Sequence, residues 1–206
     1  MPPEPIPARP YRGIPQDERR AQRRTQLITA GIAVYGERGF RQATVKAVCE
    51  AAGLTERYFY ESFANSEELL IACFNEVTFA VLGEILAARA AGPEPEDRSR
   101  AMLHAYFAAL QREPRSARVF LVEIRGVSRA VDKAFDAALR SIGEEVGRIV
   151  EAPGAESDPL LMAGIVGGVI HIALRWIEDG YTPDIERVTD SALKLGTAAA
   201  QPAGPG

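Results

Sequence analysis

Helical periodicity is the feature that most constrains this chain. Apolar residues recur every three or four positions through most of its 206 residues, which places them on one face of a helix. Leu27, Gly31 and Val34, for example, share such a face in a segment that Gly39 ends. No segment shows the sustained two-residue alternation, bounded by turns, that is typical of strands. The sequence therefore predicts an all-α fold of about nine helices.

Capping residues set the expected boundaries of these helices. Thr44 and Thr55 are suited to the N-cap position, and Gly53 is suited to ending a helix. Asn65 and Glu68 have the spacing of a capping box. The predicted helices span residues 17–38, 45–52, 56–63, 66–89, 97–112, 114–126, 129–151, 158–179 and 184–198.

The composition predicts four regions along the chain. Residues 1–16 are rich in proline and contain arginine, so we expect a disordered, extended basic arm. Residues 17–65 hold the short helices of one predicted domain, and residues 66–198 hold the longer helices of a second. The alanine, proline and glycine of 199–206 predict a disordered tail.

The distribution of charge matters more than its total. The net charge of −4 alone argues against binding to nucleic acid. Positive charge nevertheless gathers before the first apolar run, where only Glu4, Asp17 and Glu18 oppose it. The basic residues concerned are Arg9, Arg12, Arg19, Arg20, Arg23 and Arg24.

Cysteine usage and the start of the chain indicate the compartment. Cys49 and Cys73 each lie inside a helical pattern with no partner motif, which predicts neither a disulfide framework nor a zinc site. The proline-rich, polar start does not have the pattern of a secretory signal peptide. We therefore expect a cytoplasmic protein.

The segment 44–63, TVKAVCEAAGLTERYFYESF, has the pattern of a helix-turn-helix. That motif needs a small residue where its helices cross, a glycine at the turn and a buried hydrophobe in the second helix. Cys49, Gly53 and Phe59 meet these demands. An ordinary helical hairpin with a solvated polar face fits the bare pattern as well. The face of the second helix that would point outward consists of Glu56, Arg57, Tyr58, Tyr60 and Glu61.

A longer stretch, from residue 27 to residue 70, resembles the N-terminal domain of the TetR family of transcriptional regulators. The likeness lies in LI.AG..VY.E.GF at 27–40, in Thr44 and in AAGLT....FY..F..SEELL at 51–70. It implies that residues 17–65 form a DNA-binding domain in which helix 45–52 supports a recognition helix, 56–63. The DNA-facing residues that it implies are Lys46, Thr55, Arg57, Tyr58, Tyr60 and Ser62.

The sequence departs from that family at two places. Ser66 stands where the family usually has a lysine, so one phosphate contact is missing. Arg57 and Tyr58 replace a glycine and a small hydroxyl residue, which suggests an unusual operator sequence. Glu56 and Glu61 would repel phosphates unless they face bases.

Residues 66–198 resemble the family only in their helical layout, so ligand-binding residues are inferred here from chemistry. Polar groups within apolar helices need a partner, a ligand or water. We expect a cavity with Phe74, Met102, Phe107, Phe120 and Trp176 as walls. The candidate polar contacts are Tyr106, Glu123, Arg125, His171 and Arg175. Such a cavity suits a small, largely apolar or aromatic effector.

The resemblance implies a repressor that a small-molecule effector releases from a palindromic operator, and the sequence contains no motif for catalysis. It lacks a P-loop, a G-x-G-x-x-G and a G-x-S-x-G pattern. The two histidines, His104 and His171, have no Cys or carboxylate at ligand spacing, so no metal site is expected. We expect no enzymatic activity and no cofactor.

The last two helices predict a homodimer. Leu160–Ile177 is apolar on too many sides for one protomer to cover, and helix 184–198 adds a second stripe. Two copies of helices 158–179 and 184–198 would form a four-helix bundle. A membrane span is the main alternative, although His171 and Arg175 interrupt the run and we expect no membrane partner. A helical carrier or enzyme that does not bind DNA is the other.

Overall fold

The computed structural model describes residues 15–90, 94–150 and 158–200, and these residues form helices and turns without a strand. The predicted all-α fold is therefore confirmed. Most of the predicted basic arm, 1–16, and of the predicted tail, 199–206, lies outside the described residues. Gln16 already belongs to the first helix, and the last helix runs through Ala200.

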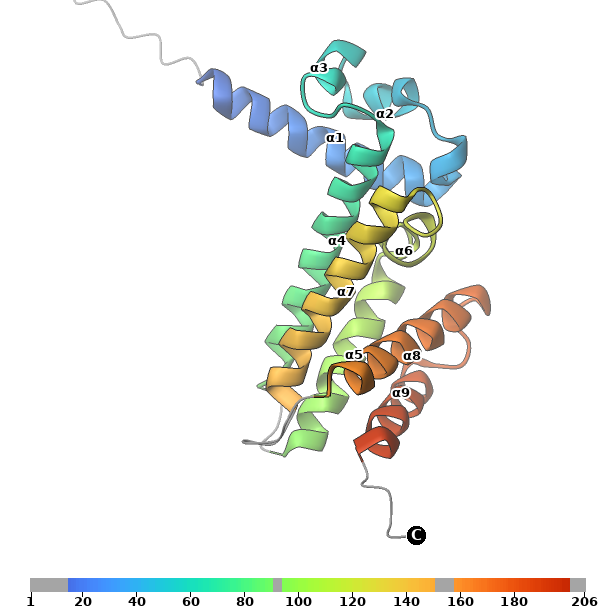
Figure 1. Cartoon of the computed structure of the whole chain (residues 1–206). Coiled ribbons are helices and arrows are strands. Elements are labelled where there is room, and N and C mark those ends of the chain that lie inside the picture. The colour runs from blue at the N-terminus through green and yellow to red at the C-terminus, as the bar shows by residue number, and fades with distance from the viewer. Residues whose placement is uncertain (1–14, 91–93, 151–157, 201–206) are drawn as a thin grey trace, which may run out of the picture.

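Nine α-helices within the described ranges follow the predicted order (Figure 1). They are α1 (Gln16–Arg38), α2 (Val45–Ala52), α3 (Glu56–Tyr60), α4 (Ser66–Ala88), α5 (Pro95–Arg112), α6 (Pro114–Arg118), α7 (Arg129–Val150), α8 (Pro159–Glu178) and α9 (Ile185–Ala200). A 3-10 turn, η1 (Phe40–Gln42), follows α1, and a π-helical turn, η2 (Val119–Glu123), continues α6. The predicted helix 114–126 is thus an α-helix that widens into a π turn.

Side-chain caps fix the starts of several of these helices, among them α2 and α4. The Thr44 hydroxyl accepts a hydrogen bond from the Ala47 N–H at 3.1 Å, at the start of α2. The Asn65 side chain accepts from the Glu68 N–H at 2.9 Å, and the Glu68 carboxylate accepts from the Ala64 N–H at 2.7 Å. Thr55 occupies the N-cap of α3, but its side chain makes no capping hydrogen bond.

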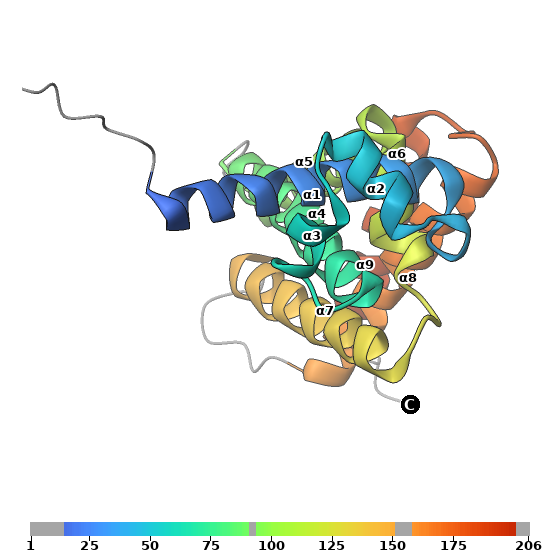
Figure 2. The same cartoon turned by 90° about the horizontal axis from the view of Figure 1, so that it is seen from above.

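The three N-terminal helices sit at one end of a bundle built from the longer ones. In Figure 1, α4, α5 and α7 run side by side away from α1, α2 and α3. α9 packs against α5, and α8 packs against α7 and α9. Figure 2, seen from above, shows α1 crossing that end of the bundle. One hydrophobic core extends from Leu27 in α1 through Phe74 and Phe107 to Ala192 in α9. The three N-terminal helices and the bundle therefore share one packed core.

Candidate DNA-binding face and ligand cavity

The two helices of the predicted helix-turn-helix meet around a small apolar core. Val48 and Cys49 of α2 are buried against Phe59 of α3 and against Phe63, which follows it. Gly53 ends α2 with φ of 66°, in the left-handed region that a glycine adopts without strain. Cys49, Gly53 and Phe59 thus occupy the positions predicted for the helix crossing, the turn and the buried hydrophobe. The recognition helix is shorter than predicted, because α3 ends at Tyr60 rather than at residue 63.

The outer face of α2 and α3 carries exposed polar and aromatic side chains. Lys46, Thr55 and Arg57 are exposed, and Tyr60 is 59% exposed. Two of these residues are each paired with a carboxylate about one turn further along the chain. Lys46 Nζ lies 3.9 Å from Glu50 Oε1, and Arg57 Nε lies 3.0 Å from Glu61 Oε1. A phosphate that approaches this face would compete with these carboxylates for the two cations.

Arginines of α1 pack against the end of the recognition helix. Arg20 donates to the Glu61 carbonyl at 2.8 Å, and Arg24 donates to the Ser62 carbonyl at 3.2 Å. The Arg23 guanidinium lies 4.4 Å from the centre of the Tyr58 ring and 3.7 Å from a Glu61 oxygen. These arginines lie in α1, within the predicted helix 17–38, and Arg20 and Arg24 bind the carbonyl groups of the turn that follows α3.

Ser62 does not belong to the outer face. Because α3 ends at Tyr60, the following turn directs the Ser62 hydroxyl inward, where it is buried without a hydrogen-bond partner among the described residues. The prediction that Ser62 faces DNA is therefore wrong. Tyr58 is half-buried, with Arg23 covering one side of its ring. Its remaining surface still lies on the outer face.

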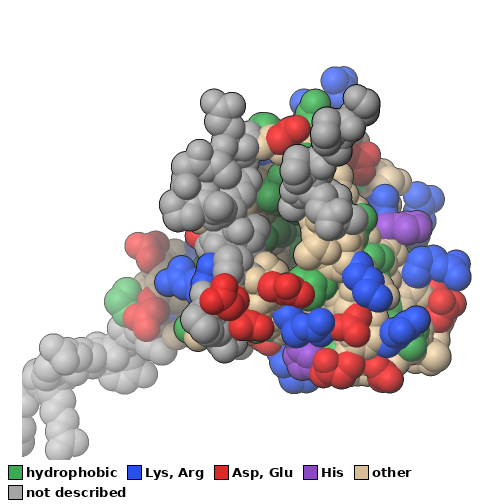
Figure 3. Space-filling view, turned by 90° about the horizontal axis from the view of Figure 1, so that it is seen from below, with side chains coloured by type: hydrophobic (Ala, Val, Ile, Leu, Met, Phe, Trp, Pro, Cys, Tyr) green, Lys and Arg blue, Asp and Glu red, His purple; other side chains and the backbone are tan. Residues whose placement is uncertain are grey.

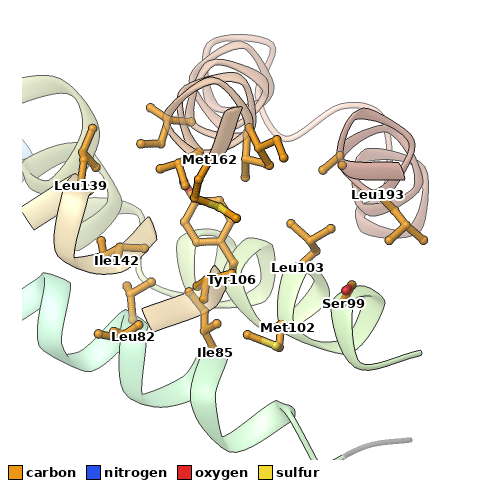
Figure 4. Close-up of a pocket in the computed structure, with 18 of the residues that line it drawn as sticks. Leu82, Ile85, Ser99, Met102, Leu103, Tyr106, Leu139, Ile142, Met162 and Leu193 are labelled. Carbon is orange, nitrogen blue, oxygen red and sulfur yellow. The ribbon is translucent and has the colours of Figure 1, made fainter. Parts of the chain in front are cut away.

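The second predicted site is a cavity of about 670 Å³ between α4, α5, α7, α8 and α9. Figure 4 shows side chains from these helices pointing into it, and Figure 3 shows hydrophobic side chains in a hollow of the face seen from below. Its apolar lining comes mainly from Val81, Leu82, Ile85, Met102, Leu103, Phe120, Leu139, Ile142, Val146, Leu161, Met162, Ile165, Val166, Val169, Ile170, Ala192 and Leu193. The polar side chains that line it are Thr78, Glu96, Ser99, Tyr106, Asp158 and Thr197.

Three of the predicted ligand-binding residues line this cavity, namely Met102, Tyr106 and Phe120. The other predicted aromatic residues lie behind the wall. Phe74 stacks on Phe120 with 5.7 Å between ring centres, so it supports the wall without lining it. Phe107 packs edge-to-face on Trp176 at 5.5 Å, and the Trp176 indole donates to the Pro183 carbonyl at 2.6 Å. These residues hold α5 against α8.

The other predicted polar contacts do not line the cavity. His171 and Arg175 are exposed on α8, where Arg175 pairs with Glu178 and Asp179. Arg125 is exposed, with its guanidinium 5.9 Å from the ring centre of Phe135. Because α8 is apolar almost all round, its sequence did not indicate which side would face the cavity.

Glu123 instead joins the bundle to the DNA-binding helices. One of its carboxylate oxygens accepts from the Phe40 N–H at 2.7 Å, and the other accepts from Arg118 Nε at 2.8 Å. Phe40 belongs to η1, directly after α1, whereas Glu123 ends the π turn that contains Phe120. A side chain of the cavity wall and an anchor of the DNA-binding end therefore lie three positions apart on η2.

The same junction contains a close approach of two backbones. A Cβ atom placed on Gly36 of α1 would lie 2.5 Å from the Arg115 carbonyl oxygen and 2.7 Å from Arg115 Cα in α6. The Arg115 side chain also pairs with Glu37 at 3.2 Å. Only a residue without a side chain lets α1 and α6 pack this closely.

One face of α8 is apolar and exposed. Leu160 is 84% exposed, and Ala163, Gly164, Gly167 and His171 follow it at helical spacing along the same exposed side. The two glycines have nothing within 4 Å of a Cβ placed on them. This face is not covered within the protomer.

The apolar stripe of α9 lies inside the protomer. Val188 and Ala192 are buried in the core, where α9 packs against α5 and α8. A Cβ on Gly168 of α8 would collide with Leu195 of α9. Gly168 therefore marks a close contact between two helices of one protomer.

Two helices of the described ranges, α4 and α8, are long and apolar enough to cross a membrane by length and composition alone. This is weak evidence, because α4 is a core helix here, and core helices satisfy the same criterion. In the described ranges, no three or more His, Cys, Asp or Glu side chains gather where they could hold a metal ion. The thiols of Cys49 and Cys73 are free and buried, and burial raises the pKa of Cys73 to about 12.

Together, a helix-turn-helix and a bundle with an apolar cavity define the class of helical DNA-binding proteins with a separate ligand-binding region. Residues 27–73 match the family of bacterial regulatory proteins called the tetR family. The segment from α1 to the first turns of α4 is thus similar to the N-terminal region of TetR-family transcriptional regulators.

Relatives and solved structures extend this likeness beyond the N-terminal helices. The transcriptional activator FasR of Mycolicibacterium smegmatis is 20% identical over 194 residues, which cover 88% of this chain and 83% of FasR. The transcriptional repressor KstR2 of Mycobacterium tuberculosis is 30% identical over 92 residues, 43% of this chain and 44% of KstR2. The fold is similar to that of Bacillus subtilis FadR in complex with stearoyl-CoA, with a TM-score of 0.68, 20% identity and coverage of 86% and 99% of the two chains.

Proposed function

We propose that this regulator responds to a small, largely apolar effector and is a repressor that the effector releases from a palindromic operator. The observation that carries the proposal is the cavity of about 670 Å³, whose walls include helices that also hold the DNA-binding end. The similarity to KstR2, a transcriptional repressor, supports this role, whereas FasR is a transcriptional activator. The complex of FadR with stearoyl-CoA supports an apolar effector. The proposal includes no catalytic step, cofactor or membrane.

Two connections would carry the signal between the sites. α4 begins at Ser66, shortly after the recognition helix, and its residues Thr78 and Ile85 line the cavity. η2 lines the cavity through Phe120 and holds the Phe40 backbone through Glu123. A ligand weakens DNA binding only by favouring the conformation that fits the operator less well. A tenfold loss of operator affinity requires about 1.4 kcal/mol of such preference.

The proposed DNA contacts lie on the outer face described above. Lys46, Thr55 and Tyr58 are suited to phosphate contacts, and Arg57 and Tyr60 are suited to phosphates or base edges. Two recognition helices about 34–36 Å apart would read half-sites one helical turn apart. Residues 17–65 would then act as the DNA-binding domain and residues 66–198 as the ligand-binding and dimerisation domain.

The proposed function is tested with two linked measurements. Selection from a random DNA pool is expected to yield a palindromic sequence. A compound that raises the melting temperature is expected to release that DNA, and the DNA is expected to weaken compound binding by the same factor. A non-palindromic selection would contradict the two-fold arrangement. Stabilising compounds that leave operator affinity unchanged would contradict the sensing role.

The exposed face of α8 supports a homodimer in which this helix forms most of the interface. The exposed side of α9 contributes mainly polar residues, including Glu186, Arg187, Ser191 and Lys194. The dimer proposed from the sequence, through helices 158–179 and 184–198, therefore relies on α8 for its apolar contact. Exposed glycines at 164 and 167 would let two copies of α8 approach closely.

Replacing Gly167 with glutamate is expected to shift the dimer towards monomer, because it places a charge in the proposed interface. The side chain has open space within its own protomer, so folding should be preserved. Sedimentation at micromolar concentration measures the effect. Gly83→Glu is the matched control, since Gly83 is also exposed within a helix and has open space around it, but on α4. A wild-type monomer, or capture of the wild type by liposomes in a flotation assay, would contradict the proposed interface.

A further inference from the structure

The polar groups of the cavity are unevenly distributed. Most of its wall is aliphatic and comes from all five surrounding helices. One of the polar side chains that line it, Tyr106, is almost completely buried. The carboxylates of Glu96 and Asp158 also line it, close to the starts of α5 and α8. No lysine, arginine or histidine is among the described residues that line the cavity.

The Tyr106 hydroxyl has no partner in the protein. Tyr106 is 6% exposed, and its oxygen is buried without a hydrogen bond to any described residue. Figure 4 shows the ring reaching from α5 across the cavity towards Met162 of α8. Burial raises the pKa of this phenol above its ordinary range, so it stays protonated and can donate. A buried hydroxyl without a partner is costly, and a ligand oxygen would satisfy it.

The two carboxylates give the other end of the cavity a negative charge. Asp158 is fixed by its role as the N-cap of α8, where its side chain accepts from the N–H groups of Leu160 and Leu161 at 2.9 and 3.1 Å. Glu96 lies in the first turn of α5 and is exposed. The nearby basic side chain of Arg100 is paired with Asp190 of α9.

This arrangement does not suit a ligand with several phosphates. Coenzyme A thioesters carry a pyrophosphate and a third phosphate group, and proteins bind such groups with arginine, lysine or backbone N–H groups. The lining offers carboxylates instead, which would repel them. The complex of Bacillus subtilis FadR with stearoyl-CoA shows what a protein of similar fold binds. It does not predict the polar end of the ligand here.

We infer that the effector is an uncharged, elongated apolar molecule with a carbonyl or hydroxyl oxygen that hydrogen-bonds to Tyr106, and that Glu96 and Asp158 select against acyl-CoA thioesters. The inference rests on the proposed function, since it names the class of ligand that the same cavity takes.

The test uses the full-length protein and the neutral dye N-phenyl-1-naphthylamine, whose fluorescence rises in apolar sites. Three compounds with a twelve-carbon chain compete for the cavity: dodecan-2-one, laurate and lauroyl-CoA. Dodecan-2-one is expected to displace the dye at a concentration roughly tenfold or more below that of lauroyl-CoA. Equal or better displacement by lauroyl-CoA would overturn the inference and leave the sensing role in place.

Two variants examine the residues individually. Tyr106→Phe is expected to weaken the binding of dodecan-2-one by about three- to tenfold, because its hydrogen bond to the protein is lost. The affinity for the dye should be unchanged. Tyr181→Phe is the matched control, since the Tyr181 hydroxyl donates to the Leu110 carbonyl and Tyr181 does not line the cavity. The double variant Glu96→Gln, Asp158→Asn should reduce the difference between the concentrations at which dodecan-2-one and lauroyl-CoA displace the dye. Asparagine at position 158 keeps the cap of α8. Glu144→Gln, away from the cavity, should not reduce this difference.

The outcomes separate the inference from the proposed function. If Tyr106→Phe does not weaken the binding of dodecan-2-one and the double variant does not reduce its advantage over lauroyl-CoA, the inference is wrong. If the dye does not bind the wild-type protein at all, both the inference and the sensing role are wrong. If dodecan-2-one binds as expected but leaves operator affinity unchanged, the inference stands and the sensing role is contradicted.

Discussion

Phe59→Ala is expected to lower the free energy of unfolding by about 3–5 kcal/mol and to abolish operator binding. Phe59 is 0% exposed and packs against Tyr60 and Phe63, with ring centres 5.2 and 5.8 Å away. The five residues of α3 are too few to stay helical without this packing. Chemical denaturation measures the stability, and a DNA-binding assay measures the function. A variant as stable as the wild type would contradict the buried position of this ring.

Three substitutions on the outer face provide the matched comparison. Lys46→Ala, Arg57→Ala and Tyr60→Ala should each weaken operator binding by about 1–3 kcal/mol. They should change the free energy of unfolding by less than about 1 kcal/mol, since these side chains are exposed. Unaltered operator binding in all three variants would remove α2 and α3 from the DNA interface. A loss of stability as large as that of Phe59→Ala would show that the three residues act through folding.

Gly36→Ala is expected to destabilise the protein by about 1–3 kcal/mol or more. The added methyl group would lie 2.5 Å from the Arg115 carbonyl oxygen, and both helices would have to shift because the colliding atoms belong to the backbone. This shift would also strain the nearby hydrogen bond between Glu123 and the Phe40 N–H. The effect opposes the usual gain from replacing a glycine within a helix. Thermal and chemical unfolding measure it.

Gly83→Ala is the control for this effect. Gly83 lies within α4 and has nothing within 4 Å of its added Cβ, so the substitution should stabilise the protein by about 0.5–1 kcal/mol. The two variants make the same chemical change in two helices. If both are stabilising, α1 and α6 do not pack as closely as described.

Local features could be predicted from the sequence because they depend on neighbouring residues. Thr44 caps α2 and Gly53 ends it, since each acts through its own backbone and the next turn. The buried positions of Val48 and Phe59 could be predicted because helical spacing shows which residues share the face that packs on the core. The same reasoning identified the resemblance that the family match confirms.

The cavity could be predicted only in part, because its lining depends on which side of each helix faces four others. Tyr106 and Met102 lie on an amphipathic helix and were identified. His171 and Trp176 lie on α8, whose apolar residues surround the helix, so nothing in the sequence distinguished its cavity side from its exposed side. Ser62 was misplaced for a different reason: the end of α3 at Tyr60 changes the direction of the next turn.

The internal ion pairs of the recognition face bear on how this protein would search a genome. Lys46 and Arg57 each form an ion pair with a glutamate of the same protein, and Arg23 lies close to Glu61 as well. A cation that binds a phosphate must first leave its carboxylate partner. It therefore contributes less to the affinity for DNA of arbitrary sequence than a cation that has no carboxylate partner. Retention on random chromosomal DNA would therefore be weak, and more of the protein would stay free to find its operator. The occupancy of that operator would then depend chiefly on contacts with bases, and less on the salt concentration of the cell.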